Sequence, residues 1–280
     1  MAEASPPQEL VMSLATLSVN PFELTLDELD ASLEATASAG YTGISVWPFV
    51  LGGAGVDTPW LVDRLAGLGL THPVTEAAFG WLNPDRDAAA AEMANLCEFA
   101  TAMGSRELVA VTMEPSLPAM DEAAACFATM CRAAADAGLQ VSIEFLPWTG
   151  IPDLATAWEL LQRADADNSG IMVDTWHWYR QPGGPNPDLL RRIPGDRLRV
   201  VQLCDATAEP PDAVDLATET MTSRLAPGDG AVDFAEVMGI LGHVGAAPIW
   251  FPEVFSAPLA ATGPQAMATR VMAATRSVLA

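Results

Sequence analysis

Short apolar segments alternate with longer amphipathic segments eight times along this chain of 280 residues. A short apolar run is typical of a buried strand, whereas apolar residues spaced three and four apart indicate a helix packed on a core. Strict alternation of the two favours a parallel sheet with helical crossovers, and eight such units favour closure into a barrel. We therefore predict the α/β class and a single (β/α)8 TIM barrel domain over residues 1–280.

Turn and capping residues predict where these elements begin and end. Thr25 with Glu28 three residues later predicts a capping box, and Gly40 predicts the end of that helix. The segment 205–230 is longer than an ordinary connection, so we expect it to cover a functional site. The predicted strands span residues 10–19, 41–49, 73–79, 107–113, 139–145, 170–175, 198–203 and 248–254. The predicted helices span residues 26–39, 58–68, 87–103, 120–137, 153–164, 187–192, 234–241 and 264–278.

The charge balance excludes several kinds of chemistry. Acidic residues number 36 against 13 basic ones, the formal net charge is -23, and the sequence contains no lysine. Without lysine the chain can form neither a Schiff base with a carbonyl or pyridoxal phosphate nor a Walker-type phosphate loop. A net charge of this sign also repels nucleic acid, whose binding requires basic side chains. We therefore expect no nucleic-acid partner.

Targeting and redox features indicate a cytoplasmic protein. Residues 1–7 lack the basic and apolar regions of a signal peptide, and no uninterrupted apolar run reaches the about 18 residues of a membrane span. The cysteines show no C-x-x-C spacing, so buried free thiols in a reducing compartment are expected. They stand at Cys97, Cys126, Cys131 and Cys204. No membrane association is expected.

Four predicted strands end in side chains with oxygen ligands. Glu144, Asp174, Gln202 and Glu253 follow the apolar runs of the fifth to eighth strands. The carboxyl ends of barrel strands converge on one face, so these residues can share one ion. Each acid alone could be a helix cap or an ion-pair partner, but several carboxylates crowded together require a cation. All-oxygen ligands suit Mg²⁺ or Mn²⁺ better than zinc, so we predict a divalent metal site.

Further residues near these strand ends are candidates for substrate binding. His177 lies one helical turn past Asp174, and Arg224 lies in the long segment after the seventh strand. Several aromatic residues also fall at predicted strand ends and predict an aromatic mouth: Trp47, Phe79, Trp81, Trp148, Trp176 and Trp178. Of these we assign Trp47, Trp148 and Trp176 to substrate binding, although roofing the barrel is an alternative role. An aromatic mouth favours a ring-bearing or polyhydroxylated substrate, and the scarcity of basic residues favours a neutral one.

Five segments near the late strand ends form a set: Ser-Ile-Glu144-Phe, Asp174-Thr-Trp-His177, Gln202-Leu-Cys-Asp205, Arg224-x-x-Pro-Gly-Asp-Gly and Glu253-Val-Phe. As a set they resemble the xylose isomerase-like TIM barrels, the sugar-phosphate isomerase/epimerase superfamily. The resemblance covers residues 139–256. It implies that Glu144, Asp174, Gln202 and Glu253 hold the ion, that Glu144 and Glu253 transfer protons, and that His177 and Arg224 contact substrate oxygens. Gln202 is similar to the hydroxypyruvate isomerase, inosose dehydratase and dehydroshikimate dehydratase branches, whereas ketose epimerases usually carry histidine there.

A metal that binds a carbonyl and an adjacent hydroxyl acidifies the carbon between them, so a glutamate can remove its proton and give an enediolate. We therefore predict a metal-dependent isomerase or epimerase of a hydroxy-ketone, with manganese or magnesium favoured and cobalt, zinc or iron allowed. A dehydratase or other lyase acting on a keto-polyol or ring-bearing ketone is the alternative, followed by a non-catalytic binding barrel. A nuclease of the same barrel class is disfavoured because the chain has only three histidines. Assembly into homo-oligomers stays open.

Overall fold

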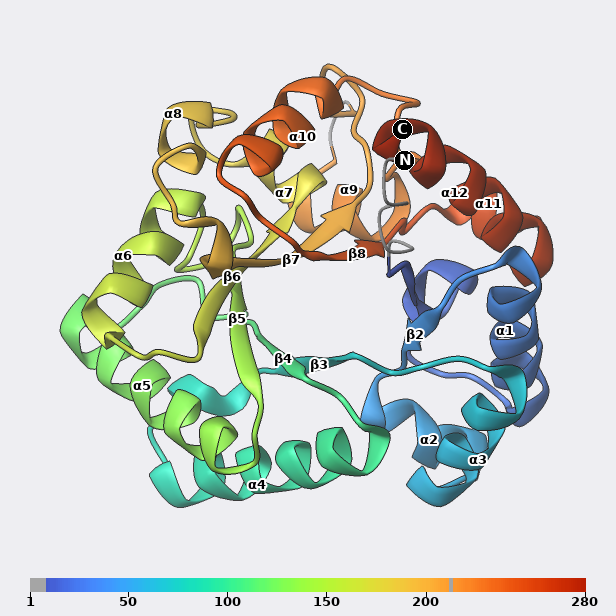
Figure 1. The fold of residues 1–280 in the computed structure, drawn as a ribbon, viewed down its shortest axis with the longest axis horizontal. Coiled ribbons are helices and arrows are strands. Elements are labelled where there is room, and N and C mark those ends of the chain that lie inside the picture. The colour runs from blue at the N-terminus through green and yellow to red at the C-terminus, as the bar shows by residue number, and fades with distance from the viewer. Residues whose placement is uncertain (1–8, 212–213) are drawn as a thin grey trace, which may run out of the picture.

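A ring of parallel strands forms the centre of the computed structural model, which describes residues 9–211 and 214–280 (Figure 1). The strands of the described residues are β1 Val11–Ser13, β2 Gly43–Ser45, β3 Val74–Ala78, β4 Glu107–Ala110, β5 Gln140–Glu144, β6 Ser169–Asp174, β7 Leu198–Leu203 and β8 Ile249–Pro252. Strands β3 to β8 form one sheet in chain order, and β1 pairs with β2. Parallel bridges Leu10–Trp250 and Gly43–Thr71 join the two sheets, so the predicted TIM barrel is confirmed.

Helices surround this ring (Figure 1). The described helices are α1 Leu26–Ala39, α2 Pro48–Ala54, α3 Thr58–Leu68, α4 Arg86–Met103, α5 Met120–Asp136, α6 Leu154–Ala164, α7 Thr175–Arg180, α8 Pro187–Leu190, α9 Leu216–Thr222, α10 Phe234–His243, α11 Ala257–Ala260 and α12 Pro264–Leu279. The predicted capping box is present, since the Glu28 amide donates to Thr25 Oγ1 and the Thr25 amide donates to Glu28 Oε2. Gly40 ends α1 at φ 86°, a left-handed conformation that glycine adopts readily.

The first two strands are shorter than predicted. Instead of residues 10–19, β1 covers only Val11–Ser13, and a 3-10 helix, η1, follows at Leu14–Leu17. Leu14 and Leu17 are apolar and buried like the residues of the strand itself. The apolar pattern therefore could not show where the strand ends. Instead of residues 41–49, β2 ends at Ser45, and Pro48 begins α2. Proline suits a first helical position, because its missing amide would have no partner there.

The strand period places the candidate ligands above an apolar layer inside the barrel. Val11, Val74, Val109, Met172, Val200 and Phe251 belong to one buried apolar cluster. Alternate strand residues point to the same face, so Asp174, Gln202 and Glu253 stand two residues beyond Met172, Val200 and Phe251 on the inner face. The apolar layer therefore forms the floor of the polar site.

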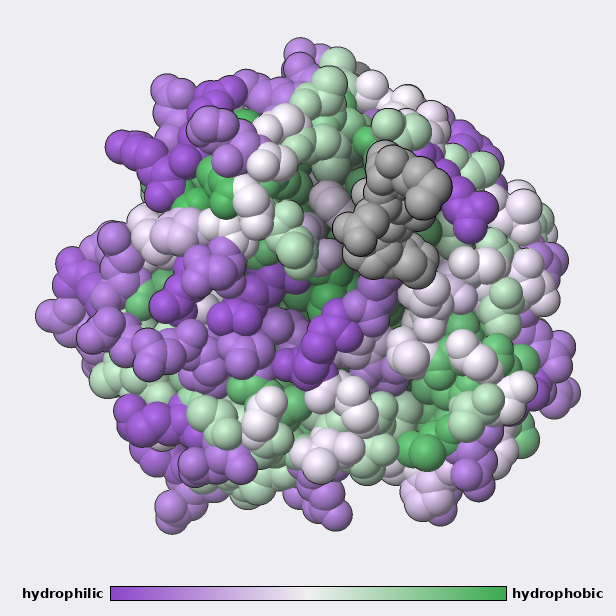
Figure 2. All heavy atoms as spheres, viewed as in Figure 1, coloured by the Kyte–Doolittle hydropathy of each residue, from purple (hydrophilic) through white to green (hydrophobic). Residues whose placement is uncertain are grey.

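The remaining sequence-based expectations concern the surface and the chain ends. In Figure 2, apolar residues gather over α2 and α3, whereas hydrophilic residues cover the side of α5 and α6. None of the helices in the described part of the chain combines the length and apolarity needed to cross a membrane. The expectation about a signal peptide concerns residues 1–7, which lie outside the described residues. All four cysteines are free, as predicted, but only three are buried, because Cys126 is partly exposed.

Candidate functional site

The barrel brings the four predicted ligands to one rim. Glu144 and Asp174 are the last residues of β5 and β6, Gln202 lies in β7, and Glu253 follows β8 directly. Asp174 pairs with Gln202 in the parallel register of β6 and β7. All four side chains are buried. Since each leaves its strand on the inner face, they form one polar layer at the carboxyl ends of the strands.

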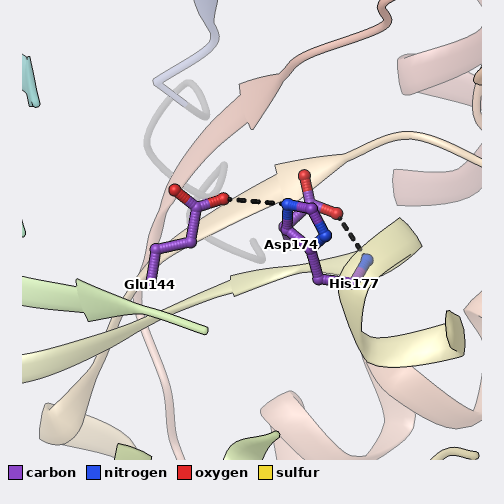
Figure 3. Close-up of side chains that lie close together, drawn as sticks. All are labelled: Glu144, Asp174 and His177. Atoms are coloured by element: carbon purple, nitrogen blue, oxygen red, sulfur yellow. Dashed lines mark hydrogen bonds and ion pairs between the residues drawn. The ribbon is translucent and has the colours of Figure 1, made fainter. Parts of the chain in front are cut away.

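Asp174 and His177 are held together by the start of α7. The Asp174 carboxylate caps this helix, because Oδ1 accepts a hydrogen bond of 2.8 Å from the His177 amide. The imidazole therefore turns back over the acids, and its Nε2 lies 3.3 Å from Glu144 Oε1 (Figure 3). Ligand atoms of Glu144, Asp174 and His177 all lie within 4.8 Å of one another. This spacing also makes His177 a candidate metal ligand, in addition to its predicted contact with substrate.

Arg224 enters the site from the segment after β7, as its position in the sequence suggested. Its Nη1 lies 2.7 Å from Asp174 Oδ2 and 3.3 Å from Glu253 Oε2. Its Nη2 lies 3.3 Å from His177 Nε2 and donates to Thr220 Oγ1 at 2.7 Å. Thr220 belongs to α9, a helix within the segment that we expected to cover the site. The guanidinium is buried and links the acids of β6 and β8.

Asp205 organises the segment that carries Arg224. Its carboxylate accepts hydrogen bonds from the amides of Gly228, Gly230 and Val232 at 2.9 to 3.0 Å. Its backbone exchanges two hydrogen bonds with Leu225, the residue after Arg224. A Cβ on Gly230 would lie 2.2 Å from the Ala206 carbonyl oxygen, so glycine is required there. Asp205 therefore anchors both sides of the loop that places the guanidinium.

Glu76 is a site residue that the sequence reasoning missed. It lies in the middle of β3, is buried, and accepts hydrogen bonds from Gln202 Nε2 at 3.1 Å and from Ser45 Oγ at 2.9 Å. It escaped notice because it does not stand at a strand end. A signal was present, because Glu76 is an acid within an otherwise uncharged strand, two residues after the inward-facing Val74. Residues two apart on a strand point to the same face, so the Glu76 carboxyl group lies inside the barrel.

Burial shifts the pKa values of the titratable groups. Burial, reinforced by Asp174, raises the pKa of Glu144 to about 8. Burial also raises the pKa of Glu253 to about 7, although Arg224 opposes the shift. For Asp174 burial acts in the same direction, but Arg224 and His177 outweigh it and keep the pKa below its usual value. Burial lowers the pKa of His177 to about 4, so the imidazole is neutral at pH 7.

The donor set fits a divalent cation. Gln202 Oε1 is buried and has no hydrogen-bond partner among the described residues, which is costly unless a ligand completes it. The carboxyl groups of Glu76, Glu144, Asp174 and Glu253 are crowded and buried, and burial together with the other acids raises the pKa values of Glu76, Glu144 and Glu253. A bound divalent ion would favour their ionised forms. Carboxylate and amide oxygens are the donors that Mg²⁺ and Mn²⁺ take.

Three of the predicted aromatic residues lie near the acids or at the mouth. The Trp148 ring lies 5.4 Å from His177 and 6.3 Å from Trp176, which is fully buried. Trp47 is half-buried and stacks on Phe22 at 5.3 Å. The rings of Phe49 and Phe255 lie 5.4 and 6.5 Å from Trp47. Phe255 in turn lies under the Arg224 guanidinium at 5.0 Å, so an aromatic path leads from the surface to the acids.

Two other aromatic residues predicted for the mouth lie elsewhere. Trp81 donates to the Val111 carbonyl at 2.9 Å and packs on Phe127 of α5. Trp178 is buried in the same core between strands and helices. Both positions follow strand ends in sequence, but each belongs to a helical turn, Gly80–Leu82 (η2) or α7, that directs the side chain outward. Phe79 is 48% exposed.

Comparison with known proteins assigns the family. A family model described as "Xylose isomerase-like TIM barrel" matches residues 33–276. The 3-dehydroshikimate dehydratase of Pseudomonas aeruginosa is 32% identical over 123 residues, which are 44% of this chain and 18% of that protein. The enzyme of the same name from Pseudomonas putida is 32% identical over 99 residues, or 35% of this chain and 15% of that protein. The chain thus spans less than a fifth of either relative.

Solved structures with low sequence identity share the fold. A xylose isomerase-like TIM barrel/4-hydroxyphenylpyruvate dioxygenase fusion protein gives a TM-score of 0.84 at 20% identity, covering 96% of this chain and 42% of that one. The IolI protein with a bound zinc atom gives 0.83 at 18% identity, covering 97% and 98%. A D-allulose 3-epimerase from Methylomonas sp. in complex with D-allulose gives 0.71 at 18% identity, covering 97% and 96%. Because the family model covers most of the chain, this protein belongs to the xylose isomerase-like TIM barrel family.

Proposed function

We propose that this protein is a divalent-metal-dependent isomerase or epimerase that moves a proton next to the carbonyl of a hydroxy-ketone. The observation that carries the proposal is the pair of buried glutamates, Glu144 and Glu253, joined through His177 and Arg224. Nε2 of His177 lies 3.3 Å from Glu144, and Nη1 of Arg224 lies 3.3 Å from Glu253. Both carboxyl groups are buried on the same rim, where one can accept a proton from the substrate and the other can return one.

The ion would be held by Glu144, Asp174, Gln202 and Glu253. When bound, a divalent ion polarises a substrate carbonyl and acidifies the neighbouring C–H. One glutamate would take that proton and the other would return one, either to the neighbouring carbon or to the opposite face. Arg224 and His177 would donate hydrogen bonds to substrate oxygens and so orient the ketone between the two acids. Because the site is buried, it would keep bulk water away from the substrate carbon that has lost its proton.

A dehydratase is the second candidate, because both curated relatives are 3-dehydroshikimate dehydratases. Gln202 is similar to the hydroxypyruvate isomerase branch as well as to two dehydratase branches, so it favours neither reaction. The first step would be the same removal of a proton next to a carbonyl. A carbon–oxygen bond at the β-position would then break, and the leaving hydroxide would take a proton from an acid of the site and depart as water. The two reactions therefore differ only in the steps after proton removal.

The aromatic path supports a neutral, ring-bearing substrate. Phe22, Trp47 and Phe49 stack at the mouth and continue through Phe255 toward Arg224. Apolar planar groups and sugar rings both stack on such surfaces. Arg224 is already paired with Asp174 and Glu253, so it has little charge left for an anionic substituent. We therefore propose a hydroxy-ketone that carries a ring, with a polyhydroxylated ketone as the alternative.

Metal analysis followed by proton exchange tests this function. We expect about one divalent ion per wild-type chain, and weaker retention by Glu253→Gln and Asp174→Asn. Hydroxy-ketones are then incubated with the loaded protein in deuterated water and followed by NMR. Deuterium next to the carbonyl without loss of water indicates an isomerase or epimerase, and loss of water indicates a dehydratase. Tight ligand binding with neither deuterium exchange nor loss of water would contradict both and favour a binding barrel.

A further inference from the structure

The Gln202 side chain has one end fixed and the other end free. Its Nε2 donates a hydrogen bond of 3.1 Å to Glu76 Oε1, whereas its Oε1 is buried without a partner among the described residues. An amide that rotated by half a turn would present its NH₂ group to the site, and this group cannot bind a cation. Metal binding by Gln202 therefore depends on which way its amide faces.

Glu76 is placed so that only one orientation of the amide is favourable. Its two carboxyl oxygens accept from different donors, Oε1 from Gln202 Nε2 and Oε2 from Ser45 Oγ at 2.9 Å. Rotation of the Gln202 amide would break its hydrogen bond of 3.1 Å to Glu76 Oε1 and would turn Nε2 toward the other ligands. Both side chains are buried, so water cannot easily replace that hydrogen bond.

We propose that Glu76 is a positioning residue that directs the Gln202 carbonyl oxygen toward the metal ion. This inference rests on the proposed function, because it requires the ion. Ser45 of β2 holds Glu76, and Glu76 of β3 holds Gln202 of β7, so the early strands orient a ligand supplied by a late one. Hydrogen-bond partners behind metal ligands typically contribute about 10–100-fold to metal affinity.

Mn²⁺ titration of the whole chain, with free Mn²⁺ followed by electron paramagnetic resonance, tests the proposal. Glu76→Met fills the same space without an acceptor, and we expect it to weaken Mn²⁺ binding about 10–100-fold. Gln202→Ala removes the ligand itself. In the double variant, loss of Glu76 should cost nothing further, because there is no amide left to orient. Additive losses would show that Glu76 acts independently of Gln202 and would overturn the inference.

Two more variants separate orientation from charge and from general damage. In Glu76→Gln the new amide can still accept from Gln202 Nε2 through its oxygen, so affinity should stay within about threefold of wild type. A loss as large as that of Glu76→Met would mean that the negative charge matters instead of the hydrogen bond. Glu107→Met is the matched control, because Glu107 is also a buried strand glutamate bonded to a serine, Ser142 Oγ at 2.6 Å. It should leave Mn²⁺ affinity unchanged.

The titration distinguishes a failure of the proposed metal function from a failure of the positioning role of Glu76. If the wild-type chain binds no Mn²⁺, the proposed metal function falls and this inference falls with it. If wild type and Glu76→Met bind Mn²⁺ equally tightly, the metal function stands and the positioning role of Glu76 is overturned. If Glu76→Met does not fold, a large loss of Mn²⁺ affinity in Glu76→Gln still overturns the inference.

Discussion

The two halves of the barrel rim carry different kinds of residues. Strands β5 to β8 contribute the candidate ligands Glu144, Asp174, Gln202 and Glu253. Strands β1 to β3 contribute groups that hold these ligands, since Ser13 Oγ donates to Glu253 Oε1 at 3.0 Å and Glu76 accepts from Gln202. The segments after β1 and β2 add the aromatic rings of the mouth. The late half thus supplies the chemistry, and the early half supplies orientation and an apolar surface.

Removing an acid of the late half should have the largest effect. Glu144→Gln and Glu253→Gln keep the shape of the side chain but cannot accept a proton, so turnover should fall by about 10²–10⁴-fold. Rates of solvent deuterium exchange into the substrate measure this directly. The control is Glu159→Gln, which changes an exposed glutamate of α6 paired with Arg163 and should leave the exchange rate unchanged. Equal exchange rates in all variants would refute proton transfer by either acid.

Arg224 should dominate the stability of the late half. Arg224→Met leaves Asp174 and Glu253 buried without their cation and should destabilise the fold by about 3–5 kcal/mol. Arg270 pairs with Asp229 at the exposed surface, so Arg270→Met should cost only about 0–1 kcal/mol. Urea denaturation of the metal-free proteins compares the two. If both variants lose a similar free energy of unfolding, Asp174 and Glu253 do not depend on Arg224 to offset their charge.

Glu107, at the amino-terminal end of β4, should give a pH-dependent effect. Burial raises the pKa of Glu107 from 4.5 to about 7, so the folded state retains a proton that the unfolded chain has released. Its contribution to stability is therefore lost as pH rises from about 4.5 to about 7. Glu107→Gln cannot ionise, so it should stabilise the fold by about 3 kcal/mol at pH 8 and by almost nothing at pH 4. Urea denaturation at both pH values checks this, and a gain that does not depend on pH would contradict it.

The early half should show the smallest effects, and they should be specific to substrate. Phe22 and Phe49 are 51% and 52% exposed, and alanine at either position should raise KM for a ring-bearing hydroxy-ketone about 2–10-fold. KM for hydroxyacetone, which has no ring, should not change. Phe79→Ala is the control, since that ring is 48% exposed but takes no part in the stack around Trp47. An equal change in KM for both ketones would mean that the substrate ring does not bind at Phe22 and Phe49.

Much of the barrel could be predicted from local pattern. The predicted helix 26–39 coincides with α1, because its cap residues Thr25, Glu28 and Gly40 lie within or beside the helix. Strand β7 coincides with the predicted residues 198–203 for a similar reason, since its apolar run is short and bounded. The extent of β1 was wrong because its apolar run continues into the buried helical turn η1, and the extent of β2 was wrong because Pro48 begins a helix. Burial and strand pairing are different properties, and only the second depends on a neighbouring strand.

By itself, the sequence determined the alternation of strands and helices and placed an oxygen donor at the end of each late strand. These features arise from periodicity and capping over a few residues. Only the tertiary structure decided that Glu76 meets Gln202, 126 residues away, that Arg224 turns inward between two acids, and that Trp81 and Trp178 pack outward. The physical reason is that such contacts form when the barrel closes, and closure depends on all its strands at once.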